Sequence, residues 1–172
     1  IGKIQYLLVE ERIKEKKVIE LINNLIISLW QNKKEKNRRF FWIDKVSFDE
    51  KSEYIDLGIA HGLCSILVFL TKLKELKHNN SKIDLLMDGV IKTLIESENI
   101  NKGVSYFPDR YSIKNKHLVT KDSRLGYCAG DLPIAYSLFY AGYVTKNNNL
   151  IVYSTQILKF CSKREVSNSG LL

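Results

Sequence analysis

Apolar residues recur at spacings of three and four along most of the chain, which is the period of an amphipathic α-helix. No segment alternates apolar and polar residues over a useful length, so strands are not predicted. The sequence therefore predicts an all-α fold in a single domain over residues 1–172, with about five helices arranged as hairpins. We expect these helices over residues 4–30 (one helix, or two divided near Arg12), 57–77, 82–98, 132–143 and 150–163.

The connections between these helices differ in composition. Residues 31–39 and 44–52 are polar and predict exposed loops. Residues 40–43 read Phe-Phe-Trp-Ile, which is too apolar for an exposed loop and predicts a short extended segment over an edge of the core. Residues 99–122 form a long connection with several aromatic residues, and ordered connections of this length are often functional.

Two helix starts carry residues that typically accept the free N–H groups of a first turn. Ser81 precedes the segment 82–98, and Asp131 precedes the segment 132–143, so each is a predicted N-cap. Pro133 fits the first turn of the latter helix, where its missing N–H costs little. We therefore expect Asp131 to cap a helix rather than to act as a catalytic acid.

Composition and charge narrow the class of protein. The 172 residues are 45% hydrophobic and 27% charged, which is ordinary for a globular domain, and no apolar run reaches the length of a membrane span. The formal net charge is +8, but no nucleic-acid-binding motif accompanies it, so we predict no nucleic-acid partner. We interpret the densest basic run as a solvated loop; it comprises Lys33, Lys34, Lys36, Arg38 and Arg39.

The three cysteines lack the spacing of a disulfide framework, which favours a reducing, cytoplasmic compartment. Cys64 and Cys161 fall on helical segments; Cys64 is expected to be buried, and Cys161 to be in the core or half-buried. His78 and His117 are expected to be solvated.

Two short glycine-rich loops, each opening a helix, carry the candidate chemistry. In the first, Cys128 stands between Gly126 and Gly130, so its thiol should lie at a helix N-terminus, where the helix dipole favours a thiolate. In the second, His61 stands just before Gly62 at the start of an apolar helix. Taken alone, each has an ordinary alternative: a small buried cysteine in a turn, or a hydrogen-bonded histidine.

Together the two loops resemble the lanthionine synthetase C-like cyclases. Residues 58–62 (Gly-Ile-Ala-His-Gly) look like the family's G-x-A-H-G motif, and residues 124–131 (Arg-Leu-Gly-Tyr-Cys-Ala-Gly-Asp) look like its R-L-x-W-C-x-G-D motif. The resemblance implies an α/α toroid, of which this chain would supply about half the helices. Such a partial toroid leaves apolar helix faces uncovered, so we expect self-association or loose packing of the isolated chain.

The resemblance also implies a chemistry. Cyclases of this family use zinc to add cysteine thiolates of a dehydrated precursor peptide to dehydroalanine or dehydrobutyrine, which forms the thioether rings of lantibiotics. Cys128 matches one zinc ligand, His61 matches a histidine proposed for acid–base work, and Arg124 matches an arginine near the enolate. A dehydratase is a further implied partner. Because a catalytic zinc site takes three protein ligands, we expect residues 1–172 alone to bind zinc weakly or not at all.

Several positions depart from the family pattern. Tyr127 replaces the usual Trp, Ala129 stands where many members have Tyr, and Cys64-Ser65 replaces a Pro-Gly or similar pair. The family's Cys-His-Gly motif is missing, and we expect it directly beyond Leu172. The alternative function is a non-catalytic piece of a helical toroid that binds a peptide or a thiol, or assembles with another chain.

Overall fold

The computed structural model describes residues 14–43, 54–78, 80–99, 103–108, 110–111 and 122–164. Five helices make up most of these residues, which confirms the all-α prediction. They are α2 (Lys16–Asn32), α3 (Leu63–Glu75), α4 (Lys82–Glu96), α5 (Asp131–Thr145) and α6 (Asn148–Cys161). None of the helices in these ranges is long and apolar enough to cross a membrane.

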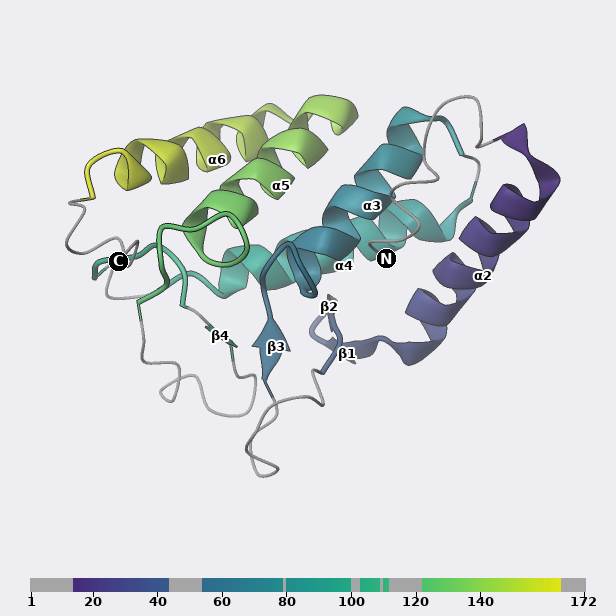
Figure 1. Ribbon diagram of the computed structural model, residues 1–172, viewed down its shortest axis with the longest axis horizontal. Helices are drawn as coiled ribbons and strands as arrows, with labels where there is room; N and C mark the ends of the chain where they lie inside the picture. The colour runs from purple at the N-terminus through teal and green to yellow at the C-terminus, as the bar shows by residue number, and fades with distance from the viewer. Residues whose placement is uncertain are drawn as a thin grey trace.

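The helices pair as predicted. α3 and α5 lie side by side and run in the same direction, while α4 packs behind α3 and α6 returns antiparallel to α5 (Figure 1). α2 packs against α4 on the side away from α6. The N-terminal ends of α3 and α5 therefore face the same end of the molecule.

α3 is the centre of the core because helices cover it on two sides. Leu67, Phe69 and Leu70 are fully buried on it, and even Thr71 has no exposed surface. Burying one large apolar side chain contributes roughly 1.5–3 kcal/mol to the stability of the fold. The packing of α3 therefore fixes the position of its first turn.

The start of α3 lies later than predicted. The sequence pattern placed it at residue 57, but the helix begins at Leu63. Residues 57–62 form a loop instead, and before it residues 55–56 form β3 (Ile55–Asp56), which pairs antiparallel with β4 (Arg110–Tyr111). The side chain of Asp56 then accepts the N–H of Gly58 at 2.6 Å, and a Cβ at Gly62 would overlap the Asp56 carbonyl. The glycines thus allow a tight loop where apolar periodicity alone predicted helix.

The basic run is a β-hairpin, so the prediction of a loop over residues 31–39 is wrong, but Lys34, Lys36 and Arg38 are exposed to solvent as predicted. β1 (Lys34–Lys36) pairs with β2 (Arg39–Phe41) in an antiparallel register. Arg39 is buried and forms an ion pair with Glu96 on α4 at 2.7 Å. Thr93 donates its hydroxyl hydrogen to the Phe40 carbonyl at 2.8 Å. The predicted extended apolar segment is confirmed in β2, which covers α4.

The helix caps differ in part from the predictions. Ser81 occupies the N-cap position of α4, but its side chain makes no capping hydrogen bond. The side chain of Asn80 accepts the N–H of Lys82 at 3.0 Å instead. Asn147 caps α6 by accepting the N–H groups of Asn149 and Leu150. In α4, the capping role is therefore taken by Asn80, the residue before the predicted cap.

His78 is half-buried rather than solvated, and it gives the fold a pH dependence. Its Nε2 lies 3.1 Å from Oδ1 of Asn23 on α2, and burial lowers the pKa of His78 below the ordinary 6.5. Because the unfolded chain then binds this proton more readily, the stability linked to His78 is full above the ordinary value and is lost as pH falls below it.

We expect the melting temperature to fall between about pH 7 and about pH 5, and to fall less in His78→Gln, whose side chain does not titrate. Thermal unfolding of both proteins across this range measures the difference. Equal losses in wild type and His78→Gln would contradict the assignment.

Candidate functional site

The two glycine-rich loops contact each other at the shared end of α3 and α5 (Figure 1). We call residues 58–62 the His61 loop and residues 124–130 the Cys128 loop. The N–H of Ile59 donates to the carbonyl of Cys128 at 3.0 Å. A Cβ at Gly58 would lie 2.5 Å from that same oxygen, so the two backbones touch directly. The fold thus brings together two sequence motifs that lie more than sixty residues apart.

All three predicted site residues present exposed side chains on these loops. His61 lies in the His61 loop, and Arg124 and Cys128 lie in the Cys128 loop. Exposure of Cys128 excludes its alternative interpretation as a small buried cysteine in a turn. An imidazole, a guanidinium and a thiol are therefore open to solvent on two loops in contact.

The other two cysteines are buried, as predicted. Burial raises the pKa of Cys64 and of Cys161 to about 12, so both remain protonated thiols at neutral pH. Within the described part of the chain, Cys128 is the accessible thiol.

The Cys128 loop is closed at its base by Gly130. This residue has φ +94° and ψ −152°, a conformation that side chains rarely adopt. A Cβ there would lie 2.5 Å from the carbonyl oxygen of Arg124 and 2.7 Å from Oγ of Ser123. The start and the end of the loop therefore lie in contact, and only glycine fits between them.

Asp131 is not the helix cap that the sequence predicted. The N-cap position of α5 is Gly130, and no side chain caps this helix. The Asp131 carboxylate is fully buried and accepts the N–H groups of Tyr106 at 3.1 Å and Phe107 at 2.9 Å. It also pairs with Arg164 at 3.1 Å. Burial raises the pKa of Asp131, while the two amides and Arg164 act in the opposite direction. Asp131 therefore joins distant segments beneath the loop.

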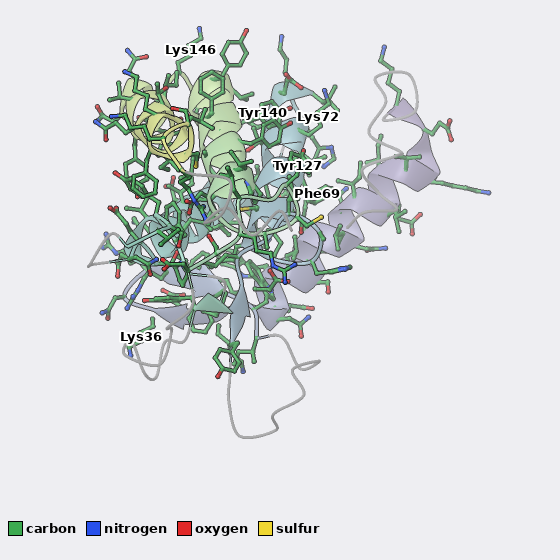
Figure 2. The ribbon with its side chains drawn as sticks, turned by 60° about the vertical axis from the view of Figure 1, so that its left-hand side comes forward. Lys36, Phe69, Lys72, Tyr127, Tyr140 and Lys146 are labelled. Carbon is green, nitrogen blue, oxygen red and sulfur yellow. The ribbon has the colours of Figure 1, made fainter. Side chains whose placement is uncertain are left out.

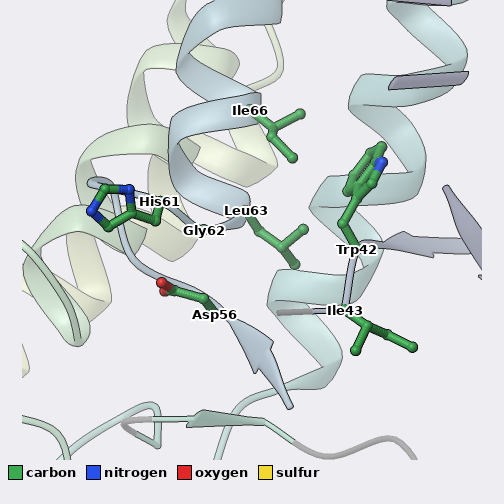
Figure 3. A pocket seen from close by; sticks show the side chains of 7 residues that line it. All are labelled: Trp42, Ile43, Asp56, His61, Gly62, Leu63 and Ile66. Atoms are coloured by element: carbon green, nitrogen blue, oxygen red, sulfur yellow. The ribbon is translucent and has the colours of Figure 1, made fainter. Parts of the chain in front are cut away.

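A pocket of about 180 Å³ lies beside the His61 loop (Figure 3). Its walls come from that loop, from the first turns of α3 and from the segment after β2, and the imidazole of His61 points away from Trp42. The sequence did not predict that residues 42–43 reach this site, because the contact depends on how the hairpin packs on α4. The lining residues are Trp42, Ile43, Asp56, His61, Gly62, Leu63 and Ile66.

Aromatic contacts join tyrosines from the Cys128 loop along α5; Figure 2 labels the two ends of this row, Tyr127 and Tyr140. The ring centroids of Tyr127 and Tyr136 are 6.3 Å apart, and Tyr136 stacks on Tyr140 at 6.2 Å. The hydroxyl of Tyr140 donates to Glu75 at 2.8 Å. Tyr127 on the Cys128 loop and both Tyr136 and Tyr143 on α5 are exposed.

The described residues do not by themselves fit a zinc ion. Among them, no three His, Cys, Asp or Glu side chains come close enough to hold a metal. A catalytic zinc site takes three protein ligands, and Cys128 offers one. His117, the expected break near Arg12, and residues 165–172 lie outside the described residues.

Comparisons with known proteins agree with this arrangement. The chain matches the sequence profile of one family, described as lanthionine synthetase C-like protein, over residues 1–171. No curated protein matches it. Among solved structures it resembles nisin cyclase, with a TM-score of 0.73 and 18% sequence identity. The match covers 95% of this chain and 43% of that chain, so this chain spans less than half the length of nisin cyclase.

These matches confirm the predicted fold, a partial α/α toroid. The family profile covers almost the whole chain, and it agrees with the two loop motifs that first indicated the resemblance. The chain belongs to the lanthionine synthetase C-like protein family.

Proposed function

We propose that the full-length protein containing this chain is a cyclase that forms thioether rings in a dehydrated precursor peptide during lantibiotic biosynthesis. The contact between the His61 loop and the Cys128 loop is the observation that carries the proposal, because it gathers His61, Arg124 and Cys128 at one end of two parallel helices. A non-catalytic toroid piece would have no need of these three exposed groups, so the alternative is not favoured.

The proposed reaction is an addition. The sulfur of a peptide cysteine bonds to Cβ of dehydroalanine or dehydrobutyrine, and the carbon–carbon π bond opens toward Cα and the adjacent carbonyl. The resulting enolate takes a proton at Cα, while the thiol has given up its own proton. Atoms and electrons balance without an oxidant or a reductant.

Two residues of this chain fit roles in that addition. His61 is exposed on the His61 loop, and an imidazole is the side chain most often used as a general acid or base. Arg124 offers a guanidinium group, which can stabilise the negative oxygen of the enolate. Its backbone lies in the same closed loop as Cys128, so the two side chains act from one rigid support.

We also propose that Cys128 supplies one ligand of a zinc site in the full-length protein, with the other ligands from outside the described residues. When bound, zinc would hold the substrate thiol as a thiolate. Cytoplasmic action and a dehydratase that supplies the modified peptide belong to the same proposal. Three free cysteines are consistent with a reducing compartment.

A peptide with one cysteine and one dehydroalanine tests the function. Addition conserves mass, so ring formation appears as loss of the alkylatable thiol without a change in peptide mass. We expect the full-length protein to accelerate this loss, and to leave the thiol of a matched serine peptide unchanged. Equal rates with and without the protein would reject the proposal.

Replacing His61 with asparagine should slow cyclisation by about 10²–10⁴-fold, the usual cost of losing general acid–base help. Because His61 is exposed, the melting temperature should not change. Single-turnover rates measure the effect, and His78→Gln, at the other end of α3, is the matched control. A rate within about twofold of wild type would exclude His61 from the reaction.

A further inference from the structure

We propose that Arg164 is a positioning residue, which fixes the Cys128 loop by holding both of its ends. The expected effect of Arg164 on catalysis rests on the proposed function, whereas its effect on the loop does not. Arg164 lies just after α6, outside both sequence motifs, and its side chain is only 4% exposed.

One guanidinium contacts the residue before the loop and the residue after it. Nη2 of Arg164 donates to the carbonyl of Ser123 at 2.8 Å, and Nη1 donates to Oδ2 of Asp131 at 3.1 Å. Ser123 directly precedes Arg124, and Asp131 directly follows Gly130. The hydroxyl of Ser123 also lies 3.5 Å from Oδ1 of Asp131. The loop that carries Arg124 and Cys128 is therefore closed beneath by Arg164, which contacts both ends, and by the contact between Ser123 and Asp131.

The same carboxylate anchors the loop to a third segment. Asp131 accepts the backbone N–H groups of Tyr106 and Phe107, and the Cys161 thiol lies 3.8 Å from its Oδ2. These contacts use both carboxylate oxygens, so the position of Asp131 is fixed from several directions. Arg164 extends this fixed frame to Ser123 at the start of the loop.

The geometry requires a planar fork. A guanidinium presents several N–H groups in fixed directions and can reach two acceptors at once, whereas an ammonium is a single point of charge. Losing Arg164 would leave a fully buried carboxylate without its cation and would release the start of the loop. Small displacements of catalytic groups cost large factors in rate, so the loop's position should govern turnover.

The chain offers a matched control. Arg39 is a second buried arginine in an ion pair, with Glu96 at 2.7 Å, and it lies on the β1–β2 hairpin away from the Cys128 loop. Arg164→Met and Arg39→Met therefore make the same chemical change at a buried guanidinium, although the carboxylate left unpaired is buried at Asp131 and exposed at Glu96. The general effect of removing a buried guanidinium from an ion pair should appear in both variants.

The experiment measures hydrogen exchange of the segment 124–130 and of Ile59, together with kcat and KM, in the full-length protein well below its melting temperature. In Arg164→Met we expect loop exchange at least about tenfold faster and kcat about 10- to 100-fold lower with KM little changed. Arg39→Met should leave loop exchange and kcat near wild type. Arg164→Lys can retain one of the two contacts, so its loop exchange and its kcat should lie between those of wild type and Arg164→Met. This variant replaces Arg164→Met in the experiment if the methionine variant does not fold.

Three outcomes would overturn the positioning role. They are unchanged loop exchange in the Arg164 variants, equal effects of Arg164→Met and Arg39→Met on kcat, and full kcat in Arg164→Lys with unchanged exchange. Hydrogen exchange needs no substrate, so it decides whether Arg164 fixes the loop even if the wild-type protein proves not to cyclise peptides. The latter result would reject the proposed function alone.

Discussion

Cys128→Ala in the full-length protein is expected to remove zinc and ring formation together. Cys128 is the exposed thiol on the Cys128 loop, and a site with three protein ligands reduced to two loses its geometry. Because losing a residue that merely supports a metal ligand already costs roughly 10–100-fold, losing the ligand itself should cost more. Metal analysis of the purified protein and the thiol-loss assay measure the two effects separately.

Cys64→Ala is the control for this prediction. Cys64 is fully buried on α3, and its raised pKa of about 12 keeps it a neutral thiol. We expect this variant to keep its zinc and to form rings at the wild-type rate. Equal zinc content and equal ring formation in wild type and Cys128→Ala would reject the assignment of Cys128 as a ligand.

Gly130→Ala should cause the largest loss of stability among single changes in the Cys128 loop. The substitution places a side chain at φ +94°, and the new Cβ lies 2.5 Å from the Arg124 carbonyl. Backbone strain costs about 1–3 kcal/mol and overpacking a similar amount, so the free energy of unfolding should fall by about 2–6 kcal/mol. Denaturant unfolding measures this loss.

Gly126→Ala is the matched control in the same loop. A Cβ there would have its nearest neighbour, the carbonyl oxygen of Ala129, at 4.0 Å, which is an ordinary van der Waals distance. Its cost should stay within about 0.5 kcal/mol, as for ordinary surface positions. If the two variants were equally stable, the closed form of the loop would be wrong.

Much of the fold could be predicted because helical periodicity is a local signal. The ends of α4 and α6 fall within two residues of the expected positions, and the α3–α4 and α5–α6 hairpins follow from short connections. The hairpin at residues 34–41 was missed because its burial comes from packing on α4, where the Arg39–Glu96 pair removes a charged residue from solvent. The ion pair joins residues far apart in the sequence, so it cannot be predicted from the local pattern of residues.

The candidate site was predictable where chemistry and glycine spacing coincide. His61, Arg124 and Cys128 were identified from two motifs, and the structure places both motifs in contact through Ile59. Arg164 carried no such signal, since an arginine after a helix resembles any solvated basic residue. The misassigned role of Asp131 has the same cause: its partners at residues 106–107 and 164 are brought to it only by the tertiary fold.

The contact between the two loops is made by main-chain atoms, and this bears on how such a protein can diverge. The N–H of Ile59 and the carbonyl of Cys128 are groups that nearly every amino acid supplies, and Gly58 contributes only the space its missing side chain leaves. Mutation can therefore exchange an exposed side chain such as Tyr127 while the main-chain contact between the loops is retained. Side chains on the two loops can therefore change during evolution without a change in the main-chain contact that holds the loops together.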